Sequence, residues 1–307
     1  MKYLEKINKL DKNNILSLDE IVLCALELFQ NKKINKLDIS GFKKPLIVGS
    51  GNAIVTAKII FSGTNALFCD ETNFDKYIEK DIDGLIITSA SGEKHAVEFA
   101  KKATKKGIKT KLLTCNPNSG AGNILGKNNT IVTQKNREPY TYNTSTYLGW
   151  VLAITGEKAS NIMSFIQSDI DPIINKIDFG KYDSYLLATP DKYSSVNQLF
   201  IVKFIELFGR KIARDVFSYE QLKHAITVIP HDKELAISFG NPNFDFKSKH
   251  INIPLPNNCD LGAIMAIGYY VIGKIQNSHP QYFKENIGNY IDDINKTNFG
   301  KNMKVIV

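Results

Sequence analysis

Short apolar runs of strand character alternate with helical patterns along the chain, and this alternation limits the possible folds most strongly. In the first half, the expected strands cover residues 45–48, 66–69, 85–88, 111–115 and 131–133. Apolar residues at helical spacing follow several of these runs. Because strands that alternate with helices form parallel sheets covered by helices, we expect an α/β fold.

The second half repeats this order without repeating the sequence. Long helices are expected over residues 196–213 and 259–275, and the expected strands cover residues 185–189, 225–229, 235–240 and 251–254. Two similar α/β halves follow from this order of elements.

Residues 85–95 hold the most informative loop. The apolar run ends in Ser89, Ser91 and Gly92, and a helical pattern begins at about residue 96. The first N–H groups of a helix carry partial positive charge, and serine hydroxyls add further donors. Such a loop is suited to binding an anion, most often a phosphate. The alternative is an ordinary strand-to-helix turn in which Ser91 is the N-cap.

Other polar residues also follow the ends of predicted strands, namely Ser50, Asn116 and Ser119. Ligands of parallel α/β sheets bind at the carboxyl ends of the strands. This convergence favours the phosphate-binding interpretation of residues 89–92.

The chain has 307 residues and a formal net charge of +8. Its lysines are spread along the chain, whereas a nucleic-acid-binding protein is expected to carry a basic stripe with interleaved aromatic residues. We therefore expect no nucleic-acid partner. A positive surface would still attract anionic small molecules.

The cysteines and histidines predict no metal site. The four cysteines lie far apart without a CxxC pair, which favours a reducing, cytoplasmic setting. The histidines lack ligand spacing, and no run is long and apolar enough for a membrane span. The GxGxxG and GxxxxGK[ST] motifs of nucleotide-binding proteins are missing, so we expect no cofactor.

Four motifs in order along the chain resemble those of one family. They are Ser-x-Ser-Gly-Glu at 89–93, Glu138 with residues 144–146, residues 203–206 with 221–224, and the tail 298–305. In these motifs, residues 40–307 resemble the double-domain form of the sugar-isomerase (SIS) family. That family includes the isomerase half of glucosamine-fructose-6-phosphate aminotransferases, ketose/aldose isomerases, glucosamine-6-phosphate deaminases and fructosamine-6-phosphate deglycases.

The resemblance implies two SIS domains. Each would be a parallel sheet flanked by helices, a three-layer αβα arrangement of the flavodoxin-like type. The expected parts are a helical segment at 1–40, a first domain at 41–160, a second at 180–296, and a tail at 297–307 that closes over the active site.

The resemblance also implies catalytic roles. Glu206 would move a proton between C1 and C2 of the sugar, and His224 would open the ring from the neighbouring subunit of a homodimer. Lys301, on the tail, would steady the open-chain carbonyl or form a Schiff base. The alternative for each is structural: a helix-surface glutamate, a capping or surface histidine, and an ordinary terminal lysine.

A phosphate site and further substrate contacts follow in the same way. The phosphate would be bound by Ser50, Ser89, Ser91, Gly92 and Lys94. The other implied substrate-site residues are Gly51, Asn52, Asn116, Ser119, Glu138 and Lys203.

The sequence departs from the family pattern in four places. Lys94 replaces the usual threonine, Ala53 a serine, residues 189–191 a Gly-Arg-Gly turn, and residues 225–226 a Gly-Pro pair. The implied function is an isomerase or isomerase/deaminase acting on a hexose or hexosamine 6-phosphate. A fructosamine-6-phosphate deglycase and a non-catalytic sugar-phosphate sensor remain alternatives.

Overall fold

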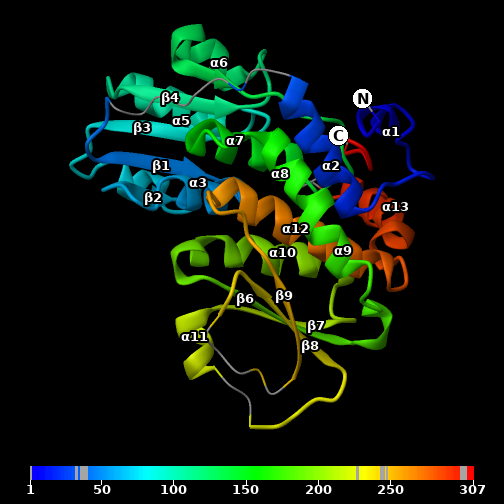
Figure 1. Ribbon diagram of the computed structural model, residues 1–307. Helices are drawn as coiled ribbons and strands as arrows, with labels where there is room; N and C mark the ends of the chain where they lie inside the picture. The colour runs from blue at the N-terminus through cyan, green and yellow to red at the C-terminus, as the bar shows by residue number, and fades with distance from the viewer. Residues whose placement is uncertain are drawn as a thin grey trace. The chain divides into compact units, whose positions relative to one another are not determined.

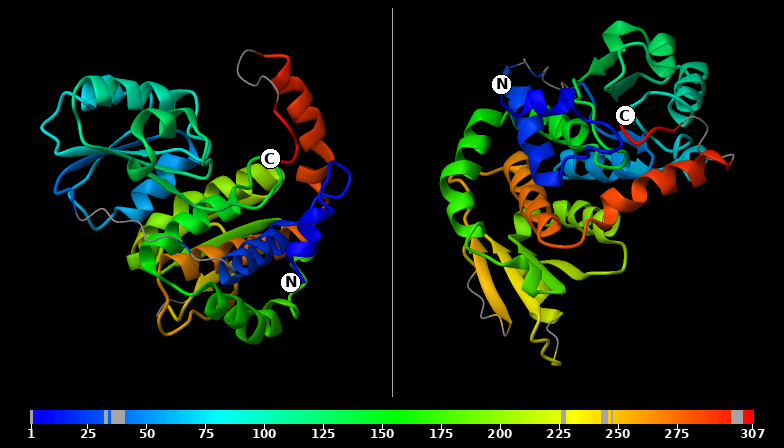
Figure 2. Two further views of the ribbon diagram at one scale, coloured as in Figure 1. Left: turned by 90° about the horizontal axis from the view of Figure 1, so that it is seen from above. Right: turned by 90° about the vertical axis from the view of Figure 1, so that its right-hand side faces the viewer.

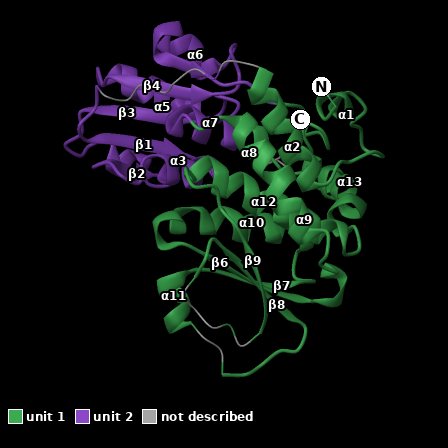
Figure 3. Cartoon of the chain, viewed as in Figure 1, with its two compact units in different colours: residues 1–32, 136–145, 157–307 green, residues 33–135, 146–156 purple. Residues whose placement is uncertain are grey.

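The chain forms two compact units in the computed structural model, which describes residues 2–31, 34, 41–225, 228–242, 246, 248–297 and 303–307. Unit 2 comprises residues 33–135 and 146–156, and unit 1 comprises residues 1–32, 136–145 and 157–307 (Figures 1 and 3). The boundaries of the two expected SIS domains stay a prediction, because these units follow packing and not chain order.

Unit 2 contains a five-stranded parallel sheet in the order β2-β1-β3-β4-β5. This order is that of flavodoxin-like folds, as expected. The strands are β1 (Pro45–Gly49), β2 (Leu67–Cys69), β3 (Gly84–Thr88), β4 (Thr110–Thr114) and β5 (Thr130–Val132). The helices in its residue ranges are α3 (Asn52–Ile60), α4 (Phe74–Tyr77), α5 (His95–Lys105), α6 (Gly120–Leu125) and most of α7 (Thr144–Thr155), with a 3₁₀ turn at Lys127–Asn129.

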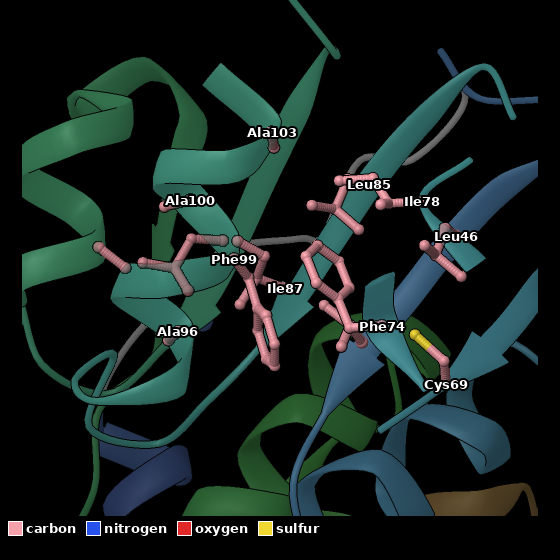
Figure 4. Close-up of a cluster of buried hydrophobic side chains, with 13 residues drawn as sticks. Leu46, Cys69, Phe74, Ile78, Leu85, Ile87, Ala96, Phe99, Ala100 and Ala103 are labelled. Carbon is pink, nitrogen blue, oxygen red and sulfur yellow. The ribbon is translucent and has the colours of Figure 1, made fainter. Parts of the chain in front are cut away.

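The core of this sheet explains why the strands read as continuous apolar runs. A parallel strand covered on both faces buries every side chain, and all five residues of β3 are buried. Phe99 of α5 packs on Phe74 with ring centroids 4.4 Å apart (Figure 4). As the sequence predicts, α5 ends before Gly107, whose φ of +67° suits glycine.

Unit 1 contains a four-stranded parallel sheet in the order β7-β6-β8-β9. Its strands are β6 (Ser184–Thr189), β7 (Ala213–Ser218), β8 (Glu234–Phe239) and β9 (Lys249–Ile253). Its helices are α1 (Leu4–Asn8), α2 (Leu18–Asn31), α8 (Ala159–Phe165), α9 (Asp171–Ile174), α10 (Asn197–Phe208), α11 (Tyr219–His224), α12 (Leu261–Asn277) and α13 (Tyr282–Asn295), with a π turn at Ile166–Ile170 and 3₁₀ turns at Phe179–Lys181 and Asp191–Val196.

The prediction of a strand at residues 225–229 is wrong. The described residues there form bends, and Val228 is 88% exposed. The sheet position is filled by β7, which pairs with β6 in the register Leu187↔Val216. The expected helix 196–213 ends earlier, because Gly209 has a φ of +57° at the C-cap of α10 and the chain then enters β7.

Helices α2 and α12 pack closely within unit 1. A Cβ on Gly273 would lie 2.0 Å from the backbone nitrogen of Asp19, so the two backbones approach where glycine permits it. None of the helices in the described part of the chain is both long and apolar enough to cross a membrane.

Candidate functional site

The serine loop of unit 2 lies between β3 and α5. The N–H of Gly92 donates to Ser89 Oγ at 3.1 Å, and the N–H of Glu93 donates to Ser91 Oγ at 3.3 Å. The N-cap of α5 is Lys94, with a φ of +47°, so Ser91 is not the helix cap. The loop therefore differs from an ordinary turn capped by Ser91. Two short turns, closed by the serine hydroxyls, hold its backbone before the helix begins.

The neighbouring loop after β4 supports this conformation. Asn116 Nδ2 donates to the carbonyl of Ser91 at 3.1 Å, and the N–H of Gly120 donates to Glu93 Oε1 at 2.8 Å. Gly92 has a φ of +65°, and a Cβ there would lie 2.5 Å from Ser119 Cβ. The structure thus brings Asn116 and Ser119 to the serine loop, although Ser119 is fully buried and caps α6 through the N–H of Gly122.

The loop after β1 lies at the same edge of the sheet. Gly49 pairs with Thr88 at the ends of β1 and β3, so Ser50 and Ser89 follow neighbouring strands. Gly51 is exposed with a φ of +55°, and Asn52 opens α3. The predicted phosphate-binding residues of unit 2 therefore lie on adjacent loops.

Unit 1 holds a buried ion pair on α10. Lys203 is only 1% exposed, and its Nζ lies 2.6 Å from Glu206 Oε2, while the Glu206 side chain is 16% exposed. The same Nζ donates to the carbonyls of Thr141 at 3.1 Å and Tyr142 at 2.9 Å. An ammonium has three donors, and these contacts use all of them.

The burial pattern of α10 differs from what hydropathy alone predicts. The sequence suggests that apolar Val202 and Ile205 point inward, but Val202 is half-buried and Ile205 is 39% exposed. Lys203 takes the buried position, because backbone carbonyls and a carboxylate satisfy its charge.

Glu206 lies in the wall of a pocket of about 520 Å³ within unit 1. Residues from the end of α10 and from α13 form most of the lining. These residues are Thr141, Ile205, Glu206, Leu207, Phe208, Gly209, Arg210, Lys211, Tyr282, Phe283, Asn286, Ile287 and Tyr290.

Glu138 anchors the segment that leads to this pocket. Its buried carboxylate accepts the N–H groups of Thr144 at 2.6 Å and Ser145 at 2.7 Å at the start of α7. Burial raises the pKa of this carboxyl, against the effect of these hydrogen bonds and of the charge of Lys203. The structure thus gives Glu138 the role of a helix cap.

The end of the chain pairs with the same segment. Val307 and Glu138 exchange two backbone hydrogen bonds of 2.9 Å, and the N–H of Tyr140 donates to Val305 at 2.7 Å. Asn295 at the end of α13 hydrogen-bonds both backbone groups of Met303. Figure 2 marks the C-terminus, at which this stretch ends in red.

The other two expected catalytic residues have different outcomes. His224 is the last residue of α11 and is exposed. Lys301 lies outside the described residues, together with the rest of residues 298–302. Among the described residues, no group of His, Cys, Asp and Glu is arranged to hold a metal ion.

Sequence reasoning missed Thr141 and helix α13. The spacing of Phe283, Ile287 and Ile291, which are all buried, is that of a helix face and could have revealed α13. No local signal marks Thr141, because its position depends on Lys203.

The two parallel sheets flanked by helices are consistent with the SIS fold of solved phosphosugar isomerases to which this chain is similar. Among solved structures, glucosamine-6-phosphate deaminase from Thermotoga maritima is similar at 15% identity and a TM-score of 0.58, over 91% of this chain and 94% of that one. The C-terminal domain of glucosamine-fructose-6-phosphate aminotransferase from Francisella tularensis is similar at 14% identity and a TM-score of 0.56, over 94% and 96%.

Tagatose-6-phosphate ketose/aldose isomerase from Escherichia coli is similar at 13% identity and a TM-score of 0.55, over 92% of this chain and 94% of that one. No protein-family model and no curated protein matches the sequence. At these identities, the likeness establishes the fold.

Proposed function

We propose that the chain is a sugar-phosphate isomerase or isomerase/deaminase that acts on a hexose or hexosamine 6-phosphate. The observation that carries this proposal is the carboxylate of Glu206, held by buried Lys203 in the wall of a pocket. A carboxylate in a fixed direction, with partial access to a ligand, is suited to general base catalysis.

The proposed reaction is a proton transfer between neighbouring carbons. Glu206 removes the proton from C2 of the open-chain aldose, and the electron pair forms an enediol as the carbonyl oxygen gains a proton. The protonated carboxyl then returns a proton to C1, and loss of the proton from the C2 hydroxyl leaves the ketose. With an amino group at C2, the same transfer produces an imine that water hydrolyses to release ammonia.

Lys203 is proposed to aim the carboxylate. His224 of the partner subunit would open the sugar ring in a homodimer, since the pKa of a histidine lies near neutrality. Lys301 would steady the open-chain carbonyl from the tail. Glu138 would act indirectly, by holding the segment that carries Thr141.

The phosphate is proposed to bind the loops at the edge of the unit 2 sheet. Ser50, Ser89 and Ser91 would supply hydroxyl donors there, Gly92 would hold the loop in shape beside the phosphate, and Lys94 would supply a positive charge. Positive φ at Gly92 and at Lys94, together with the serine turns, gives this loop a turn conformation, and backbone turns of this kind can form anion-binding concavities. Gly51, Asn52, Asn116 and Ser119 would shape the surrounding site.

A fructosamine-6-phosphate deglycase is the alternative that the pocket itself favours. Its lining combines the aromatic rings of Tyr282, Phe283 and Tyr290 with the cations of Arg210 and Lys211. Such a surface would suit a substituent on the amine that has an apolar body and a carboxylate.

The test is a panel of hexose, hexosamine and fructosamine 6-phosphates, scored for isomer formation and for release of ammonia or amine. Glu206→Gln keeps the size of the side chain but removes the carboxylate that would act as the base. Turnover should therefore fall by roughly 100-fold or more. Glu220→Gln is the matched control, because Glu220 also pairs with a lysine three residues away at 2.6 Å but is 65% exposed. Binding of sugar phosphates without any turnover, and without an effect of Glu206→Gln, would instead favour a sensor.

Subunit mixing tests the homodimer. Glu206→Gln and His224→Asn subunits would each be inactive alone. Co-expressed in equal amounts, they should recover roughly a quarter of wild-type activity, since half of the dimers are mixed and each mixed dimer keeps one intact site. If no activity returns, His224 does not act across an interface.

A further inference from the structure

Thr141 has an unusual backbone conformation beside Glu206. Its φ is +76°, in the left-handed region that β-branched residues rarely adopt. Strained residues of this kind persist only where surrounding contacts hold them, and they gather at binding and catalytic sites.

Contacts at Thr141 and at the residue before it hold this conformation. Its carbonyl accepts a hydrogen bond from Lys203 Nζ at 3.1 Å, and the same Nζ lies 2.6 Å from Glu206 Oε2. On the N-terminal side, Tyr140 is hydrogen-bonded to the backbone of Val305. One lysine therefore fixes both the Thr141 backbone and the Glu206 carboxylate.

The side chain of Thr141 has a hydroxyl that the fold does not use. Thr141 lines the pocket together with Glu206, and its Oγ1 is buried without a hydrogen-bond partner among the described residues. Buried hydroxyls are nearly always paired, so an unpaired one in a pocket wall indicates a group that a ligand pairs.

We infer that the Thr141 hydroxyl hydrogen-bonds an oxygen of the sugar at the carbons that Glu206 serves, and so positions the substrate and selects for that oxygen. The inference rests on the proposed isomerase function and adds to it a binding residue outside the family motifs in the sequence. The contacts of Lys203 and Tyr140 hold the Thr141 backbone before the substrate arrives, so little ordering of the backbone is needed on binding.

Thr144 provides a matched control in the same segment. Its Oγ1 is also buried without a partner among the described residues, but Thr144 does not line the pocket. Removing the hydroxyl at 144 therefore tests the effect of an unpaired hydroxyl alone.

The experiment compares Thr141→Val, Thr141→Ser and Thr144→Val with the wild type, using the most active sugar phosphate of the panel. Thr141→Val keeps the β-branched shape, so its backbone preference is unchanged. We expect its kcat/KM to fall by about 10-fold or more, with Thr141→Ser restoring most of the loss and Thr144→Val having little effect.

Thermal unfolding without substrate gives the second measurement. Because the hydroxyl has no partner among the described residues of the unliganded chain, Thr141→Val should keep or raise the Tm. A clear fall in Tm would show that the hydroxyl stabilises the fold and would overturn the inference. If the wild type turns over a sugar phosphate and Thr141→Val has the same kcat/KM, the inference is also overturned. The proposed function is not affected by that result. If the wild type turns over none of the panel, the proposed function fails and the inference fails with it.

Discussion

Lys203 and Glu206 form an ion pair of 2.6 Å, one turn apart on α10, in which the lysine is almost fully buried and the glutamate reaches a pocket. The same pairing occurs on the surface of α11 between Lys223 and Glu220, also at 2.6 Å. The two pairs differ in burial, and this difference decides what each contributes.

Lys203→Met should destabilise the fold strongly. The substitution leaves the carbonyls of Thr141 and Tyr142 without their donor and Glu206 without its counter-charge, at a cost of about 3 kcal/mol in the free energy of unfolding. Urea unfolding measures this change. Lys223→Met is the control and should cost less than about 1 kcal/mol, because exposed ion pairs contribute little. Equal losses for the two variants would contradict the role given to Lys203.

Gly92→Ala should disturb the serine loop. Its φ of +65° disfavours alanine, and the added Cβ would lie 2.5 Å from Ser119 Cβ. We expect KM for a sugar phosphate to rise by about 10-fold or more, since a shift of the loop would misplace the proposed phosphate contacts.

Gly107→Ala is a control that separates backbone strain from steric contact with a neighbouring side chain. Gly107 has a similar φ of +67°, but a methyl group there would have no atom within 4 Å, so its substitution should cost about 1 kcal/mol without changing KM. A KM that responds equally to both substitutions would argue against a phosphate site at residue 92.

Removal of residues 305–307 should weaken the pocket wall. These residues make three backbone hydrogen bonds to Glu138 and Tyr140, and the segment they hold continues to Thr141. We expect a loss of about 1–3 kcal/mol in stability together with a fall in kcat/KM. Val307→Ala keeps the backbone bonds and should behave like the wild type. Full activity of the truncated chain would show that this pairing does not support the site.

The stability should fall as the pH drops below about 6.5, the pKa of an unperturbed histidine. Burial lowers the pKa of His279, so the unfolded chain takes up a proton that the folded chain does not. His279→Phe removes this proton uptake, and Tyr185 keeps its hydrogen bond to the carbonyl of Phe179. Tm measured from pH 7.5 to 5 should therefore decline less steeply for the variant, although His250, whose pKa burial also lowers, keeps part of the slope. Identical slopes would show that His279 is protonated in the fold.

Local pattern was sufficient for much of unit 2. Strands β1, β3 and β4 are short runs buried on both faces, and such runs are recognisable without knowledge of their partners. The placement of Ser89 and Asn116 on adjacent loops follows from the same reasoning, because parallel strands end at one edge of a sheet.

Pattern failed where a neighbour decided the outcome. Residues 225–229 are apolar enough for a strand, but β7 pairs with β6 in their place, and pairing is not encoded in either segment alone. On α10, hydropathy placed Ile205 inward, whereas carbonyls from residues 141 and 142 allow Lys203 to be buried there.

The α/β class, the parallel pairing of the strands and the positions of the loops that follow them could be derived from the amino-acid sequence. These features depend on apolar runs and on the alternation of strands and helices along the chain. Three features required the folded chain: Lys203 joins Thr141 to Glu206, the end of the chain pairs with residues 138–140, and a threonine hydroxyl is left unpaired among the described residues in a pocket wall. They arise from contacts between segments more than 60 residues apart, where burial and hydrogen bonding depend on which groups meet.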